Sequence, residues 1–162
     1  MFKGFLNIVG IDGESTDDKH EEWIEVLSYN HGITQTSTMH SGGGGGAGKS
    51  THEDFIIAKS LDKASPKLVL ACCNGEHIPK VVLELCHSGG ERQKFMEYEM
   101  EDVIVASVRP CGSTNGEKPM PVEEIAFRYG KIKFVYTIFD PQSGASAGYV
   151  QTHWNVKENK GG

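Results

Sequence analysis

The sequence predicts a mainly β protein with a two-sheet, β-barrel-like fold, one short flanking α-helix and a long glycine-rich loop. Three observations carry this prediction. Apolar and polar residues alternate with a period of two over long stretches, which is typical of half-buried strands. One segment alone has both a helix start signal and a helix stop signal. The chain has 162 residues, of which 38% are hydrophobic, so we expect a single domain over residues 1–162.

Two long strands are predicted over residues 95–108 and 122–139. In the first, one face carries Met96, Tyr98, Met100, Ile104, Ala106 and Val108, and the glutamates at 97, 99 and 101 lie on the other face. In the second, the apolar phase changes at Gly130. A bulge at Gly130 would let this strand bend around a corner, because one extra residue reverses which face points inward.

The shorter elements follow from turn and cap residues. Further strands are predicted at 2–9, 23–30, 33–39, 53–61, 78–87 and 148–157, with 53–61 also compatible with a helix by periodicity. The helix is predicted to begin with Ser65 as N-cap and Pro66 at its first position, and to end at Asn74 and Gly75. Loops are expected at residues 12–21, 40–52, 88–92, 110–121 and 140–147.

The charge distribution excludes several classes of function. With 16 Lys and Arg against 22 Asp and Glu, the formal net charge is −6, and the basic residues are spread singly. We therefore expect no nucleic-acid binding, which needs a basic face or stripe, and no membrane insertion, which needs about 18–20 apolar residues in a row. The first twelve residues lack the features of a Sec signal peptide. We expect cytoplasmic synthesis, and export only by a route that needs no cleaved leader.

Residues with reactive or metal-binding side chains form no recognisable site. The four cysteines, at 72, 73, 86 and 111, have no C-x-x-C spacing. The seven histidines form no metal-binding or triad-like local motif, and the acidic loop around Asp17 and Asp18 lacks the spacing of a calcium loop. We expect no enzyme activity, no cofactor and no metal ion.

The glycine-rich tract at residues 41–48 leaves alternatives open. Gly43–Ser50 formally matches the phosphate-binding P-loop pattern G-x-x-x-x-G-K-[ST]. However, the residues before it are too polar for the buried parallel strand that a P-loop follows. A nucleotide-binding protein and a monomeric β-barrel that binds a small ligand remain the alternative hypotheses.

Several motifs, in their order and spacing, carry a resemblance to a known family. They are Gly13-Glu14-Ser15 with His20, Gly32 with Gln35, the run Gly42–Gly46 followed by Ala47-Gly48-Lys49, Asp62–Pro66, Ala71-Cys72 with Gly75 and His77, Gly89-Gly90-Glu91, Asp102-Val103 with Ser107, and Trp154-Asn155. The whole chain resembles the Hcp (haemolysin-coregulated protein) family, the secreted tube protein of bacterial type VI secretion.

The resemblance implies a structural function. Members of this family form hexameric rings that stack into a tube inside a contractile sheath, behind a spike protein, and the rings can carry and chaperone effector proteins in their lumen. It also implies that the loop Gly42, Gly43, Gly44, Gly45, Gly46, Ala47, Gly48 and Lys49 contacts a neighbouring subunit. By the same resemblance Tyr29, Asn30 and His31 line the lumen. Many members have other residues before Gly32, so we expect a cargo preference particular to this chain.

Overall fold

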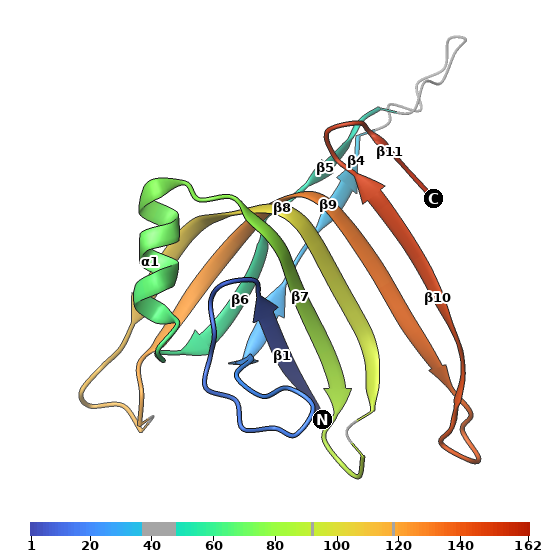
Figure 1. Ribbon diagram of the computed structural model, residues 1–162, viewed down its shortest axis with the longest axis horizontal. Coiled ribbons are helices and arrows are strands. Elements are labelled where there is room, and N and C mark those ends of the chain that lie inside the picture. The colour runs from blue at the N-terminus through green and yellow to red at the C-terminus, as the bar shows by residue number, and fades with distance from the viewer. Residues whose placement is uncertain (37–47, 92, 118) are drawn as a thin grey trace.

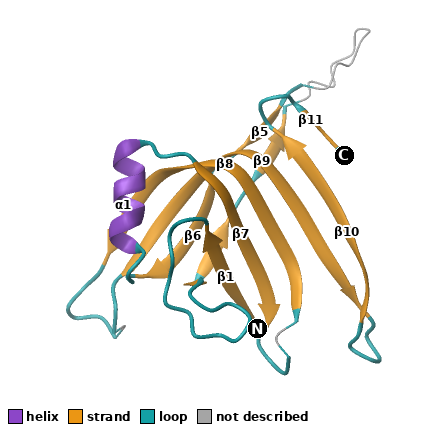
Figure 2. Ribbon diagram, in the orientation of Figure 1, coloured by secondary structure: helices purple, strands orange, loops and turns teal. Residues whose placement is uncertain are grey.

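The computed structural model describes residues 1–36, 48–91, 93–117 and 119–162, and these residues form a β structure with one short helix (Figures 1 and 2). In chain order the elements are β1 (Phe2–Ile8), β2 (Ile24–Val26), β3 (Ser28–Asn30), β4 (Ile33–Gln35), β5 (Ser50–His52), β6 (Phe55–Ser60), α1 (Ser65–Asn74), β7 (Ile78–His87), β8 (Lys94–Cys111), β9 (Val122–Phe139), β10 (Ser146–Asn155) and β11 (Lys160–Gly161).

The main sheet closes into a barrel because the segment β2–β3 changes its partner. Strand β2 pairs with β1, and β3 pairs with β6. Leu27 lies between the two strands, and its N–H donates a hydrogen bond to the carbonyl oxygen of Ala58 at 2.8 Å. The pairs β6–β9, β9–β8, β8–β7 and β7–β1 complete the circuit. The predicted barrel-like fold is confirmed, but the single strand predicted at 23–30 is two strands.

Large apolar side chains fill the barrel. The most deeply buried members of this core include Phe55, Phe127, Leu6, Ile8, Ile24, Ile57, Leu83, Met100 and Ile125, with Leu68 of α1 packed against them. Each fully buried side chain of this size stabilises the fold by about 1.5–3 kcal/mol. The barrel interior is therefore a packed core, which argues against the hypothesis of a closed cavity for a small ligand.

Strand β9 extends beyond its partner β6, and the first half of β8 lies beside this extension. Residues 122–127 of β9 pair with β6, whereas residues 131–139 pair with β10. Strand β10 therefore lies outside the barrel, beside the second half of β9 (Figure 1). We call this extension the wing; it consists of residues 94–100 of β8, 131–139 of β9, and β10.

Where the wing begins, the alternation of inward-facing and outward-facing residues reverses in both long strands. Asp102 has φ 54°, a left-handed conformation that is uncommon for a residue other than glycine, and it lies against Gly130. The pairing continues through this point without a shift, from Glu101 with Lys131 to Val103 with Tyr129. The change of apolar phase is therefore real, but the bulge predicted at Gly130 is wrong. The register shift lies between Val105 and Ser107.

The same change of face corrects one strand assignment. Met96, Tyr98 and Met100 pack on the core as predicted. Beyond Asp102 the buried residues are Val103 and Val105, not Ile104 and Ala106.

Helix α1 ends as predicted, but its N-cap differs. Gly75 adopts φ 66° and donates its N–H to the carbonyl of Ala71, which closes the helix. The N-cap is Ala64, not Ser65. The Ser65 hydroxyl instead donates to Glu123 Oε1 at 2.7 Å, because a buried charge there needs a partner. Among the described residues, no helix has the length and apolar character needed to cross a membrane.

Strands β4 and β5 form a separate two-stranded ribbon that stands away from the barrel (Figure 1). We call it the ribbon. β4 is shorter than the strand predicted at 33–39, whose last three residues lie outside the described part, and β5 lies within the loop predicted at 40–52. The ambiguous segment 53–61 contains strand β6 and no helix.

Candidate assembly surface

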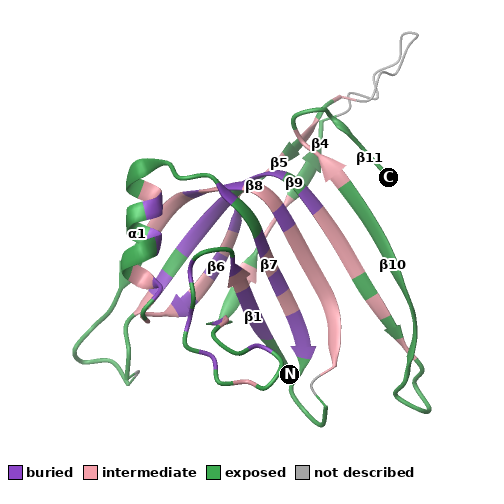
Figure 3. Cartoon of the chain, viewed as in Figure 1, coloured by how far each residue is buried: buried purple, intermediate pink, exposed green. Residues whose placement is uncertain are grey.

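Strand β10 is exposed along most of its length. Its first eight residues are exposed, with 66% of Tyr149 and 62% of Val150 accessible to solvent. Figure 3 shows the contrast with the purple, buried stretches of the barrel strands. A group of apolar side chains that stays exposed in the single chain indicates a surface that another chain covers in an assembly.

The outer edge of β10 is also unpaired over residues 146–152. Strand β11 pairs only with Trp154 and Asn155, and within the described residues no strand pairs with the rest of this edge. The edge sequence Ser-Ala-Gly-Tyr-Val-Gln-Thr contains no charged residue and no proline. Charges and prolines normally protect an edge from pairing with other chains, so this edge is open to a further strand.

One face of the wing continues the apolar core into solvent. Residues directly opposite each other across the strands form three rows: Met100 with Ile132 and Trp154, Tyr98 with Phe134 and Thr152, and Met96 with Tyr136 and Val150. Exposure rises along these rows. Met100 is fully buried, whereas 51% of Tyr136 is accessible. The apolar face therefore lacks a cover at its outer end.

The opposite face of the wing is charged and largely paired within the chain. Lys80 Nζ lies 2.8 Å from Glu99 Oε1, and Lys133 Nζ lies 3.1 Å from Glu99 Oε2. The hydrogen bond from Lys80 lowers the pKa of Glu99, and the same bond raises the pKa of Lys80. This face is suited to contact with water, so the two faces of the wing have different roles.

A groove of about 450 Å³ separates the ribbon from the wing. Its apolar wall consists of Ile33, Phe134 and Trp154. Polar groups at its rim come from Gln35, Ser50, His52 and Thr152. The groove joins the exposed apolar face to the base of the ribbon, so an associating chain would contact both.

The predicted subunit-contact loop is described only at its end. Gly42, Gly43, Gly44, Gly45, Gly46 and Ala47 lie outside the described residues. Gly48 is half-buried, and a Cβ atom there would lie 2.8 Å from the carbonyl oxygen of Thr36. Lys49 is exposed and is followed by strand β5. A P-loop lysine opens a helix, so the fold argues against the nucleotide-binding hypothesis.

The three predicted lumen residues point in different directions. Asn30 is exposed, whereas Tyr29 and His31 are half-buried. The Tyr29 ring stacks on Phe55 at 6.0 Å between centroids, and the His31 ring stacks on the same residue at 4.9 Å. Asn30 is thus the member of this set whose side chain is available to a passing molecule.

A cluster that the sequence analysis missed lies at the base of the ribbon. Two histidines from the ends of the ribbon meet one phenol: His31 Nε2 lies 2.9 Å from Tyr129 Oη, and His52 Nδ1 lies 2.6 Å from the same atom. Burial raises the pKa of the Tyr129 hydroxyl, which therefore stays protonated. Burial also lowers the pKa values of both histidines. No local motif could reveal this cluster, because its members are far apart in the sequence.

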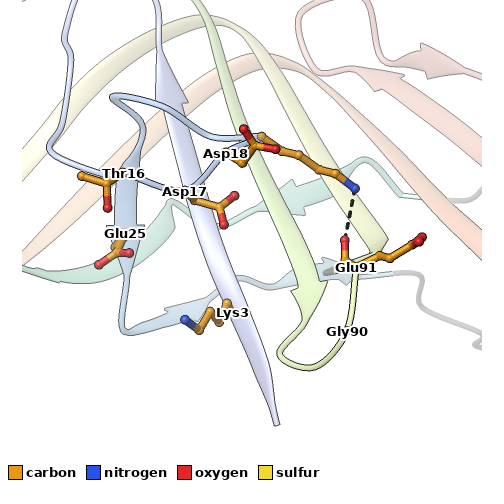
Figure 4. A pocket seen from close by; sticks show the side chains of 8 residues that line it. Lys3, Thr16, Asp17, Asp18, Glu25, Gly90 and Glu91 are labelled. Atoms are coloured by element: carbon orange, nitrogen blue, oxygen red, sulfur yellow. Dashed lines mark hydrogen bonds between the residues drawn. The ribbon is translucent and has the colours of Figure 1, made fainter.

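A second hollow, of about 800 Å³, lies between the loop after β1 and the β7–β8 turn (Figure 4). Lys19 Nζ donates a hydrogen bond to the carbonyl oxygen of Glu91 across it, at 3.1 Å. Its lining mixes the bases Lys3 and Lys19 with the acids Asp17, Asp18, Glu25 and Glu91. Binding sites are mostly apolar with a few converging polar groups, and this hollow lacks an apolar wall.

A packed barrel with an unpaired edge strand and an uncovered apolar face belongs to the class of building blocks that are completed by other protein chains. The comparisons with known proteins agree. The family described as "Type VI secretion system effector, Hcp" matches residues 5–136. The protein hcp1 of Pseudomonas aeruginosa is 34% identical over 156 residues, which cover 96% of this chain and 95% of that protein.

Two solved structures extend the likeness to the fold. A type six secretion system protein superposes with a TM-score of 0.93 at 34% identity over the full length of both chains. Hcp1 from Salmonella typhimurium gives a TM-score of 0.82 at 36% identity, covering 99% of this chain and 98% of that one. The chain belongs to the Hcp family and is a secreted tube subunit of type VI secretion. The predicted family is confirmed.

Proposed function

We propose that this chain builds the tube by joining six copies into a closed ring through the wing, and that these rings stack. The observation that carries the proposal is the exposed strand β10. Its outer edge is unpaired and uncharged, and its apolar side chains are exposed to solvent. A ring requires a head-to-tail contact, in which one surface of a copy meets a different surface of the next copy. The wing supplies one of these two surfaces.

The glycine-rich loop Gly42–Lys49 is the second part of this proposal. We infer that it reaches a neighbouring subunit, since the ribbon that carries it stands away from the barrel. Backbone without Cβ atoms approaches another chain closely, which suits a run of glycines at a contact. The spike protein, the contractile sheath and effector proteins are the further partners that the proposal includes.

The lumen of such a ring would carry effectors without chemical change. We infer that Asn30 faces the cargo, with Tyr29 and His31 supporting the strand from within. A non-enzymatic carrier needs no reacting groups, only a polar wall to which unfolded or folded cargo adheres weakly. The charged face of the wing has the composition of such a wall.

The test is the size and shape of the purified protein. Sedimentation velocity over a range of concentrations should give a particle of six copies, and negative-stain electron microscopy should give annular particles of uniform diameter. A chain that remains at 17.7 kDa at every concentration would refute the proposal. Binding and turnover of a fluorescent ATP analogue, abolished by Lys49→Ala, would favour the nucleotide hypothesis instead.

A further inference from the structure

Two hydrogen bonds between histidines and a tyrosine hold the ribbon on the barrel, and they depend on how the histidines are protonated. Both ends of the ribbon carry a histidine, and both histidines bond to the hydroxyl of Tyr129, at 2.9 Å from His31 and 2.6 Å from His52. We call these three side chains the anchor. The His52 ring also meets the Tyr129 ring edge-on, with centroids 5.6 Å apart.

Proton counting leaves the anchor complete as long as at least one histidine is neutral. A phenol hydroxyl donates one hydrogen bond and accepts others, and a neutral imidazole has one donor and one acceptor nitrogen. With neutral rings, Tyr129 donates to one histidine and accepts from the other. When both rings are protonated, each can only donate, so the phenol proton loses its acceptor and two positive charges stand close together.

Among the residues that the structure describes, the charged groups near the anchor do not supply a partner for the protonated histidines. Asp54, on the link to β6, faces Tyr129 but is held by Arg128, whose Nε and Nη2 lie 3.1 and 3.3 Å from its carboxylate oxygens. Glu53 is exposed, and its carboxylate lies over Gly32.

Within the described part of the chain, the remaining polar neighbours of the anchor carry no charge. Ser50 Oγ lies 3.3 Å from the other nitrogen of His52. The phenols of Tyr29 and Tyr98 bond to each other at 3.4 Å.

We propose that the anchor is a pH-sensitive catch, which holds the ribbon on the barrel at neutral pH and releases it in acid. Release would open the groove that Ile33, His52 and Trp154 line. The consequence for ring assembly rests on the proposed function, because the ribbon and the groove belong to the proposed contact surface. Release of the ribbon itself does not depend on that function.

The direction of the effect follows from the titration of the two histidines. Burial lowers the pKa of His52, and burial together with the charge of His52 lowers the pKa of His31. A histidine whose pKa is lowered by folding contributes stability above its unfolded value, about 6.5. That stability is lost as the pH falls below this value. The catch is therefore closed at neutral pH, and it is progressively weakened as the pH falls below the unfolded value.

The experiment measures hydrogen exchange of the full chain at pH 7.5 and 5.0, corrected for intrinsic rates, with sedimentation velocity under the same conditions. In the wild type we expect protection of the ribbon backbone to fall at least tenfold at pH 5.0, while β6 and β9 change little. Tyr129→Phe should give low ribbon protection at both pH values. The control Tyr98→Phe, which removes a part-buried hydroxyl outside the anchor, should keep the wild-type step in ribbon exchange, and it is used for the exchange measurement alone because Tyr98 lies in the wing.

The outcomes separate the two proposals. Equal ribbon protection at both pH values in the wild type would overturn the catch, as would a wild-type step in Tyr129→Phe. A chain that stays monomeric yet shows the step would overturn the proposed ring and support the catch. Six-copy rings at pH 7.5 that dissociate at pH 5.0 in the wild type, together with the exchange step, would support both.

Discussion

Replacing Val150 by aspartate should prevent ring formation without unfolding the chain. In the free subunit 62% of Val150 is exposed. Burying a whole valine side chain is worth about 1.5–3 kcal/mol, so a neighbouring copy that covers the exposed part gains about 1–2 kcal/mol. Val150→Asp removes this gain and also places a carboxylate against the apolar row of Met96 and Tyr136, where burial of an unpaired charge is unfavourable.

Together these effects should weaken each subunit contact by at least about 3 kcal/mol, which is a factor of somewhat more than a hundred in affinity. The barrel should remain folded, because Val150 contributes little to its core and a change at an exposed strand position costs less than about 1 kcal/mol. Sedimentation velocity across a concentration series measures the assembly, and thermal unfolding followed by circular dichroism measures the fold.

Two further variants make the test specific. Val69→Asp alters a valine on α1 that is 46% exposed and lies outside the wing, and it should assemble as the wild type does. Val150→Thr keeps the shape of the side chain and should weaken assembly by an intermediate amount. If Val150→Asp sediments as the wild type at every concentration, the wing is not the contact surface.

Two other predictions concern the buried charge network and the glycine-rich loop. Lys59 and Glu123 are fully buried and 2.5 Å apart, so Lys59→Met should destabilise the fold by about 3–5 kcal/mol in urea unfolding. The double variant with Glu123→Leu should recover part of that loss, because Asp62, 2.8 Å from Lys59 Nζ, still lacks its cation. A double variant as unstable as the single one would contradict this account. Gly44→Asp should weaken ring formation measured by sedimentation, because a charge would be buried between copies; unchanged assembly would mean that the loop stays in solvent.

The elements with local signals were predictable from the sequence. Alternation over residues 122–139 gave a strand with the observed bounds, and Gly75 ended the helix because its left-handed conformation is the usual stop. The Hcp family followed from short motifs whose order, taken together, is specific.

Features that depend on distant contacts were not predictable. The break at Leu27 exists because β2 and β3 pair with different strands, and no residue in that segment marks a turn. The anchor joins Tyr129 to residues 98 and 77 positions away in the sequence, so each histidine looked like an isolated surface residue. The bulge was placed at Gly130 because the pattern of one strand alone was considered. The partner strand changes its inward-facing side at Asp102, opposite Gly130, so the pairing needs no extra residue there.

The outer edges of β8 and β10 differ in how they are protected. Beyond Val103, strand β8 has left β7 and pairs only with β9 among the described strands. There it carries Arg109 and Pro110, and helix α1 packs against it. Charge, proline and a covering helix are the devices by which proteins prevent edge pairing. The corresponding edge of β10 has none of them.

This asymmetry matters for a molecule that must assemble without aggregating. Two unprotected edges would let copies add in several registers and directions, and a heterologous contact that does not close produces open filaments. With one edge protected, the open edge of β10 must meet a different kind of surface on the next copy. The groove beside the ribbon is adjacent to that edge and has an apolar wall, so the two together fix one direction of addition, and the rotation between successive copies then closes the ring.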